Sequence, residues 1–149
     1  MKALSIRQPW AWAILHAGKR IENRDWAGCA FRGPLLLHAS KTCTRAEYID
    51  AVEWMHMGGL ARLEHHMQFL SAPVVPALDA LSRGGIVGVC DLVDIVRGRT
   101  GHLEDPWFVG PLGLVLANVR PLPFTPFKGA LGFFDVPDDI AGPLLAGAP

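Results

Sequence analysis

Long apolar runs, paired cysteines and an excess of charge of one sign are all missing from this 149-residue sequence. No apolar run approaches the roughly 18 residues of a membrane-spanning helix, so we expect no membrane partner. The first ten residues, MKALSIRQPW, lack the long apolar stretch of a secretory signal, which predicts a cytoplasmic protein. The three cysteines form no CxxC pair, so we expect free buried thiols rather than zinc or redox chemistry.

Nucleotide-cofactor motifs and internal repeats are absent as well. Neither GxGxxG nor GxxxxGKS/T occurs, so cofactor-binding folds lose their main support and we expect no cofactor. The sequence is, by contrast, rich in apolar residues: 50% are hydrophobic and the mean hydropathy is +0.25. A chain of this length and composition is expected to form one domain with a sizeable core, without disulfides or metal.

The charges balance over the whole chain but not along it. Fourteen basic and 14 acidic side chains give a formal net charge of zero, which argues against holding long duplex DNA by charge alone. Residues 1–50 carry eight basic and four acidic side chains, a net +4, whereas residues 51–100 (four and five) and 101–149 (two and five) carry −1 and −3. The basic surface is therefore expected in the first third of the chain.

Short strands and helices alternate in the predicted organisation. The strongest strand signal, residues 85–96, is apolar on both faces and predicts a central position in a sheet. Gly18 suits the left-handed end of a helix, and Thr44 with Glu47 matches a capping box. We expect strands at residues 2–6, 21–26, 35–40, 85–96, 114–119 and about 133–136, and helices at 10–16, 44–57 and 60–70. Together they predict an α+β fold, a small curled barrel of five to six short strands with flanking helices.

The segment from Gly18 to Arg24 carries the densest chemistry. A helix end followed at once by a strand places Lys19 at the strand's entrance and sends Glu22 and Arg24 to one face. The structural interpretation is a surface ladder of salt bridges, each worth about 0–1 kcal/mol.

A second polar segment favours a cleft instead. His38, Ser40 and Lys41 follow an apolar run at the point where its strand is expected to end. Polar groups at a strand end, beside a helix that ends at glycine, are typical of a binding cleft.

Five segments occur in an order that resembles the ASCH domain (activating signal cointegrator homology) of the PUA-like superfamily: SIRQPWAWAI, GKRIENR, GPLLLHASK, GIVGVCDLVD and FKGALGFFDVP. The family's hallmark, a glycine with Lys-x-x-Glu-x-Arg, is met by Gly18, Lys19, Glu22 and Arg24. The resemblance covers residues 1–137 as one domain, and it implies a small β-barrel with a cleft suited to RNA. We expect residues 138–149 to form a loosely held tail.

The resemblance also implies a set of activities. Family members are mostly assigned as RNA-binding, while one branch removes the acetyl group of N4-acetylcytidine and others act as ribonucleases. The acetylcytidine branch has a lysine followed three residues later by a nucleophilic threonine. Lys19 meets the lysine, but Glu22 stands at the threonine position. A carboxylate cannot form the same intermediate, although it could orient or deprotonate a water.

Lys19 and Glu22 are the candidate catalytic residues. Lys19 could act as a base only if burial and its positive neighbours favour its neutral form, which contact with Glu22 opposes. A simpler role has Lys19 and Arg24 donate to phosphate or carbonyl oxygens while Glu22 accepts from an exocyclic amine. The alternative for Arg24 is a structural pair with Glu22 or Asp25.

Aromatic side chains are candidates for contact with a base. Trp10, Trp26 and Trp107 could stack on a ligand, although most tryptophans in a small domain belong to the core. Trp10 is favoured because it lies with Gln8 close to the hallmark segment in the family pattern, so both are candidate binding residues.

The second polar segment supplies three further binding candidates. Ser40 and Lys41 could hold the same ligand or cap the strand end. His38 could act as an acid or base near neutral pH, or it could be a hydrogen-bonded core residue. A ribonuclease would draw its acid and base from Lys19, Glu22, His38 and Lys41.

Other polar residues have structural interpretations. Asp91 and Asp94 interrupt the apolar strand, and because an unpaired buried carboxylate is costly, each should have a partner. The pair Glu53 and His56 falls short of a metal site, and the adjacent His65 and His66 point in different directions on a helix, so we expect no metal.

The sequence thus predicts a cytoplasmic ASCH-type domain that binds RNA or a modified nucleoside in a basic cleft built from residues 18–24 and 38–41. The alternatives are a metal-independent hydrolase in that cleft, either a ribonuclease or an amidohydrolase on an acylated cytidine-type nucleoside, and a protein-interaction module. A closed pocket around Lys19 would favour a nucleoside, and a groove continuous with Arg7, Arg32 and Arg45 would favour RNA. The balanced charge favours a short ligand, and no oligomeric state is predicted.

Overall fold

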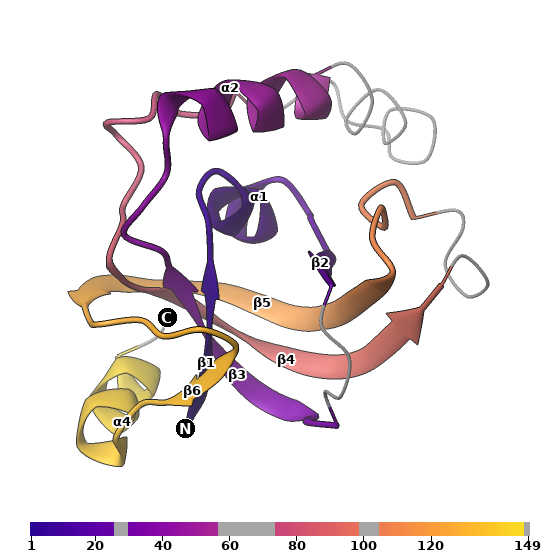
Figure 1. Cartoon of the computed structure of the whole chain (residues 1–149). Helices are drawn as coiled ribbons and strands as arrows, with labels where there is room; N and C mark the ends of the chain where they lie inside the picture. Colours follow the sequence, from indigo (N-terminus) through magenta and orange to yellow (C-terminus); the bar gives the residue numbers. More distant parts are fainter. Residues whose placement is uncertain (26–29, 57–73, 99–104, 148–149) are drawn as a thin grey trace.

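One six-stranded mixed sheet organises the chain in the computed structural model (Figure 1), which describes residues 1–25, 30–56, 74–98 and 105–147. The strand order is β2-β5-β4-β3-β1-β6. The strands are β1 (Lys2–Ile6), β2 (Ile21–Arg24), β3 (Gly33–Ala39), β4 (Gly85–Arg97), β5 (Leu112–Pro126) and β6 (Phe133–Asp135). The described helices are α1 (Trp10–His16), α2 (Arg45–Trp54) and α4 (Asp138–Ala146). The predicted α+β fold, a curled sheet with flanking helices, is confirmed.

β4 lies inside the sheet, as its apolar sequence predicts. It pairs antiparallel with β3 on one side and with β5 on the other, with register shifts in both ladders. β1 and β3 run parallel, and β6 closes the far edge by pairing antiparallel with β1. Bulges increase local twist, and they allow these long strands to curl around the helices on the inner face.

β5 extends further than the predicted strand at 114–119. Pro121 and Pro126 are within its pairing with β4, opposite Gly88 and Gly85. β2 pairs only with residues 112–115 of β5, and beyond that region no described strand covers the second side of β5. A proline, which lacks a donor, is tolerated where a strand has an unpaired side, so the prolines continue the strand rather than end it.

The two faces of the sheet carry separate cores. Leu35 and Leu37 of β3 pack with Ile14 of α1, while Leu36 between them packs with Ala141 of α4 on the other face. Figure 1 shows the same arrangement, with α1 and α2 over one face and α4 below the other. Alternating side chains point to opposite faces of a strand, so a continuous apolar run is needed where both faces are covered.

Both predicted helix signals are confirmed. Gly18 has φ +67° just after α1, the left-handed conformation that favours glycine. Thr44 accepts from the Glu47 backbone amide, and the Glu47 side chain accepts from the Thr44 amide. α2 is followed directly by a π-helical turn at residues 55–56, and residue 57, where the predicted helix ends, lies outside the described residues. The predicted helix at residues 60–70 lies outside the described residues.

The segment after residue 137 does not match the expected tail. It forms α4, whose Ala141 is 2% exposed against the second core. Asp138 and Asp139 lie in the first turn, where carboxylates favour a helix start. The small apolar residues of this segment are therefore part of the packing against β4 and β5.

Candidate functional site

The end of α1 delivers Lys19 into the interior. The Lys19 amide bonds to the Ala13 carbonyl at 3.1 Å, which closes the helix before the chain enters β2. Its side chain is 3% exposed, and Nζ donates to the Ile21 carbonyl and to Glu22 Oε2, the latter at 2.8 Å. Lys19 Nζ also lies 5.8 Å from the centre of the Trp10 ring, within range of a cation–π contact.

Glu22 is held between two cations. One carboxylate oxygen meets Lys19, and the other lies 3.2 Å from Arg24 Nη2. Arg24 Nη2 donates in addition to the Ser5 carbonyl at 2.7 Å. The Glu22 side chain is 10% exposed, so the surface ladder of salt bridges is not what forms; the hallmark residues make a buried ion-pair cluster.

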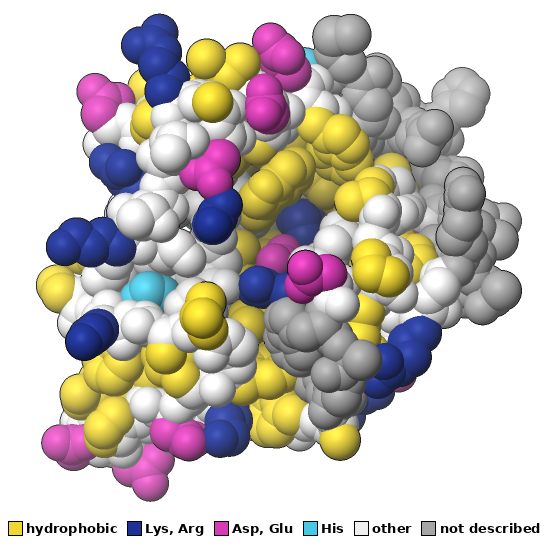
Figure 2. Space-filling view, in the orientation of Figure 1, with side chains coloured by type: hydrophobic (Ala, Val, Ile, Leu, Met, Phe, Trp, Pro, Cys, Tyr) yellow, Lys and Arg dark blue, Asp and Glu magenta, His cyan; other side chains and the backbone are white. Residues whose placement is uncertain are grey.

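A pocket of about 450 Å³ opens over this cluster, between α2 and the start of β2. We call it the tryptophan pocket. Figure 2 shows the hollow, with hydrophobic side chains on its walls and charged side chains in its depth. It is lined by Arg7, Gln8, Trp10, Lys19, Glu22, Asn23, Glu47, Asp50, Ala51, Trp54, Trp107 and Val109.

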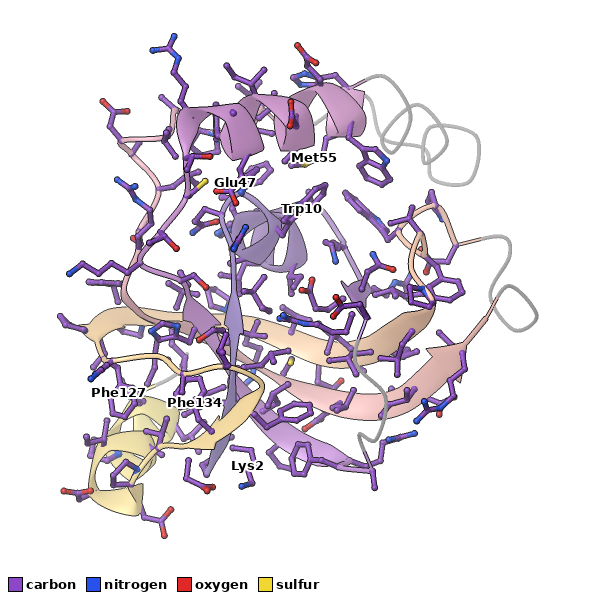
Figure 3. All side chains as sticks on the ribbon, in the orientation of Figure 1. Lys2, Trp10, Glu47, Met55, Phe127 and Phe134 are labelled. Atoms are coloured by element: carbon purple, nitrogen blue, oxygen red, sulfur yellow. The ribbon has the colours of Figure 1, made fainter. Side chains whose placement is uncertain are left out.

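Three indole rings form its apolar wall. The Trp10 and Trp54 rings meet edge to face with centroids 5.5 Å apart, and Trp54 and Trp107 are also 5.5 Å apart. In Figure 3, Trp10 lies between α1 and α2 on the side where Met55 points down. Trp107 is buried, and its indole Nε1 has no hydrogen-bond partner among the described residues.

Trp54 was missed in the sequence reasoning. Its signal is the spacing of Ala51, Trp54 and Met55 on one face of α2, the face that packs toward Trp10 and Trp107. Trp10 and Trp107 were among the three tryptophans considered for stacking, and both line the pocket. The third, Trp26, lies outside the described residues.

Two amides shape the pocket through the backbone. Asn23 donates to the Trp107 carbonyl at 2.7 Å and accepts from the amides of Val109 and Gly110. It therefore holds the loop that carries Trp107 against β2. Gln8 lines the pocket, but its amide donates to the Ser82 carbonyl and accepts from the Trp12 amide. Its polar atoms are thus engaged in holding the start of α1.

His38, Ser40 and Lys41 do not join this pocket. They line a second hollow of about 810 Å³ at the end of β3, which we call the basic hollow. Of the residues that line either cavity, Arg7 lines both. The expectation that residues 18–24 and 38–41 build one cleft is therefore wrong: they line two cavities. β5 and β4 separate β2 from β3 in the strand order, and Ser5 lies between the two segments, with its carbonyl bonded to Arg24 and its hydroxyl to His38.

His38 is a satisfied core residue. One ring nitrogen lies 3.1 Å from Ser5 Oγ and the other 2.9 Å from the Phe127 carbonyl. The four ribonuclease candidates are divided between the two cavities, with Lys19 and Glu22 in one and His38 and Lys41 in the other. They do not form one acid–base set.

Charge divides between the cavities in an unexpected way. Cations and carboxylates both line the tryptophan pocket, with Arg7 and Lys19 against Glu22, Glu47 and Asp50. Arg7 also forms an ion pair with Glu47 at its edge. The pKa of Glu47 is lowered because the amide and hydroxyl of Thr44 bond to its carboxylate and Arg7 lies beside it. The pocket that holds the hallmark residues is therefore not a basic cleft.

The remaining sequence predictions concern structural groups. Asp91 accepts from Asn118 at 2.7 Å, and Asp94 accepts from Arg32 and from the Ile95 amide, so both carboxylates have the expected partners.

The two described cysteines are free and buried. Burial, followed by the charge of Glu47, raises the pKa of the Cys43 thiol, whereas burial and Asp91 raise the pKa of Cys90 to about 12. Both thiols are therefore poor nucleophiles at neutral pH. The third cysteine, Cys29, lies outside the described residues.

Metal-binding clusters and membrane-spanning helices are both absent from the described part of the chain. Within it, no group of three or more metal-binding side chains comes together. None of its helices has the length and apolar character needed to cross a membrane.

Comparisons with known proteins bear on the fold and on the family. The chain is similar in structure to an ASCH protein from Zymomonas mobilis, with a TM-score of 0.57 and 12% identity over 99% of this chain and 95% of that one. Two point mutants of that protein give the same TM-score at 12% and 13% identity, covering 99% of this chain and 98% and 96% of theirs. At this identity the likeness shows the fold alone. No curated protein matches in sequence. The family model of the ASCH domain matches residues 4–105. Because this match covers more than half of the chain, the chain belongs to the ASCH domain family.

Proposed function

We propose that the tryptophan pocket binds a single nucleobase, presented by a nucleoside or by an unpaired nucleotide of an RNA. The observation that carries this proposal is the placement of three tryptophan rings around the buried Lys19–Glu22 pair in a cavity of about 450 Å³. A cavity of this size is typical of small-ligand sites. Stacking of a base on an aromatic ring contributes about 1–3 kcal/mol.

The polar groups at the bottom of the pocket, Lys19 and Glu22, suit the edge of a base rather than the phosphate of a nucleotide. The Lys19 ammonium has three protons, of which two go to the Ile21 carbonyl and to Glu22. Its remaining proton can meet a carbonyl or ring nitrogen, while Glu22 beside it accepts from an amino group. Adjacent donor and acceptor groups of this kind match the amino-bearing edge of cytosine, adenine or guanine, and also the N3–H and carbonyl edge of uracil.

The shape of the pocket also favours a short ligand. Arg32 and Arg45, which an extended groove was expected to include, are not among the residues that line it. Arg32 pairs with Asp94 instead. Recognition here is therefore local, as the balanced charge of the chain suggested.

Calorimetric titration with cytidine, adenosine, guanosine and uridine tests the proposal. We expect each of these nucleosides to bind, because every base carries an adjacent donor and acceptor. Trp54→Leu should weaken binding by about 5- to 150-fold, the loss of one stacking contact. Trp12→Leu is the matched control, because Trp12 lies beside His16 and does not line the pocket. The proposal is refuted if the two variants have equal effects, or if neither a nucleoside nor an unpaired RNA binds.

Hydrolysis of an acylated nucleoside is a second candidate for the same pocket. It is favoured by the carboxylate of Glu22, which sits with Lys19 where the exocyclic amide of such a ligand would lie. Glu22 would orient or deprotonate the attacking water, and the amine would leave with a proton. Incubation with N4-acylated cytidines and with total RNA, followed by chromatography, tests this activity. If wild type and Glu22→Gln give equal product, Glu22 has no part in the mechanism.

A further inference from the structure

The tryptophan pocket is poorly suited to phosphate. Three carboxylates line it against two cations, and one of those cations, Arg7, is already paired with Glu47. A phosphate placed there would meet Glu47 and Asp50 at close range, which is unfavourable for like charges. If a base occupies this pocket, the phosphates of the same ligand must lie elsewhere on the surface.

The basic hollow has the opposite charge character. Four cations line it, and none of its lining residues is acidic. Lys41, Arg83 and Lys128 are exposed and form no ion pair with any described residue. Figure 2 shows Lys and Arg side chains gathered on the left of the molecule, beside the hollow that holds the tryptophans. Unpaired cations around a concave surface attract an anion more strongly than cations on a flat one.

The fold brings these three cations together by direct backbone bonds. The Gly84 amide donates to the Ala39 carbonyl at 2.8 Å, and the Phe127 amide donates to the Gly84 carbonyl at 3.2 Å. The end of β3, the start of β4 and the end of β5 therefore meet at one place, on the left of Figure 1. Arg83 directly precedes Gly84, Lys128 directly follows Phe127, and Lys41 lies two residues after Ala39. Their spacing is set by the sheet.

The floor beneath them is tightly packed. Gly129 lies so close to His38 that a Cβ added there would be 2.6 Å from Ser5 Oγ and closer still to the His38 ring. His38 in turn bonds to Ser5 and to the Phe127 carbonyl. The loop that carries Lys128 is therefore held against a buried histidine.

Arg7 connects the two cavities. It lines both, and its side chain is 61% exposed. A ligand that leaves the tryptophan pocket past Arg7 enters a region where every charged side chain is positive. At about 810 Å³ the basic hollow is larger than the base pocket, with room for more than one phosphate and sugar.

We propose that the basic hollow is a phosphodiester-binding subsite, and that the ligand is a single-stranded oligonucleotide with one base in the tryptophan pocket and the adjoining phosphates on Lys41, Arg83 and Lys128. This inference rests on the proposed function, because it takes the base pocket as its starting point. The ligand class becomes a strand rather than a free nucleoside. RNA and DNA share this backbone chemistry, and the experiment compares them.

The test measures fluorescence anisotropy with labelled RNA and DNA octanucleotides over a salt series, alongside calorimetry with the nucleoside. The variant is Lys41→Gln/Arg83→Gln/Lys128→Gln. The matched control is Arg20→Gln/Arg97→Gln/Arg120→Gln, which removes the same charge from exposed positions that line neither cavity. We expect the first triple variant to bind octanucleotides more weakly and to reduce the slope of log K against log salt by about 2, at 0.7 per lost phosphate contact. Its nucleoside affinity should equal that of wild type.

Each outcome decides between the two proposals. Octanucleotide binding that is unchanged in the Lys41/Arg83/Lys128 variant, or reduced equally in the control, overturns the subsite while nucleoside binding still supports the base pocket. A polyglutamate peptide that competes as well as the octanucleotide also overturns it, because a site for any polyanion needs no base. Failure of wild type to bind both nucleoside and octanucleotide refutes the proposed function itself. A difference between RNA and DNA identifies which strand the subsite prefers.

Discussion

Lys19 Nζ lies 2.8 Å from Glu22 Oε2, in a place where both side chains are almost entirely removed from water. Charges in such a position lose their hydration, and their mutual attraction offsets this loss only when further hydrogen bonds are made. The Ile21 carbonyl and Arg24 supply those bonds. Because a buried ion pair contributes little net stability, its position in the floor of a ligand-sized pocket is better explained by binding than by folding.

Breaking this pair from one side should destabilise the protein strongly. We expect Lys19→Met to lower the free energy of unfolding by about 3–5 kcal/mol, because it leaves the Glu22 carboxylate buried without its closest partner. The double variant Lys19→Met/Glu22→Gln should recover part of that loss, since the buried carboxylate is then gone and the remaining charge is that of Arg24, whose side chain is 21% exposed. Urea unfolding of wild type and both variants measures the difference. If the double variant is as unstable as the single one, the cost does not come from an uncompensated charge.

Asn23 should control the pocket without touching the ion pair. Its side chain bonds to the Trp107 carbonyl and to the amides of Val109 and Gly110. Asn23→Ala leaves these backbone groups without partners, at about 1–3 kcal/mol for each that is buried. We therefore expect both lower stability and weaker nucleoside binding by calorimetry.

Asn23→Asp is the matched variant for testing these hydrogen bonds. It keeps an acceptor for the two amides and loses only the donor to Trp107, so its effect should fall between those of wild type and Asn23→Ala. If Asn23→Ala binds nucleosides like wild type, the loop that carries Trp107 keeps its position without the Asn23 hydrogen bonds.

The lowered pKa of Glu47 predicts a pH dependence at the start of α2. Its carboxylate is favoured in the folded state by the amide and hydroxyl of Thr44 and by Arg7. The unfolded chain therefore takes up a proton first as pH falls below the ordinary value of 4.5. Stability from this group is complete above that value and is lost as pH falls through the lowered pKa.

Denaturant unfolding between pH 7 and pH 3 measures this effect. Glu47→Gln should show a smaller loss of stability over the acidic part of the range than wild type. Arg7→Gln retains the Thr44 bonds, so its pH dependence should lie between the two. Identical curves for wild type and Glu47→Gln would contradict the assignment.

Gly129 provides a steric test of the basic hollow. A methyl group there would collide with His38 and Ser5, so Gly129→Ala should cost about 1–3 kcal/mol and displace the loop that carries Lys128. Gly142 in α4 is the matched control, because an added Cβ meets nothing within 4 Å. Alanine in a helix interior is favourable by up to about 1 kcal/mol relative to glycine, but a side chain directly before Pro143 opposes the helical conformation, so Gly142→Ala should be close to neutral. Thermal unfolding compares the two, and equal melting temperatures would show that the loop adapts freely.

Local signals in the sequence predicted the local structure well. The conformation of Gly18 and the capping box of Thr44 and Glu47 depend on residues a few positions apart, and both are confirmed. The central position of β4 follows from apolar side chains on both faces. These features need no knowledge of how distant segments meet.

The division of the predicted cleft needed that knowledge. Lys19 enters β2 at one edge of the sheet, whereas Lys41 follows β3, and the strand order places β5 and β4 between them. No local pattern specifies this order. Trp54 was missed for the same reason, because only the packing of α2 over α1 brings its ring to Trp10. α4 was mistaken for a tail because its small residues form a helix only against a partner surface.

The prolines of β5 have a consequence for association between molecules. Past the end of its pairing with β2, where no described strand covers the second side of β5, the strand includes Pro121, Pro123 and Pro126, which carry no backbone donor. Strands that keep their donors at an exposed edge recruit other chains into a shared sheet. This edge instead limits such pairing, so replacement of Pro121 and Pro123, which line neither the tryptophan pocket nor the basic hollow, would be expected to promote aggregation.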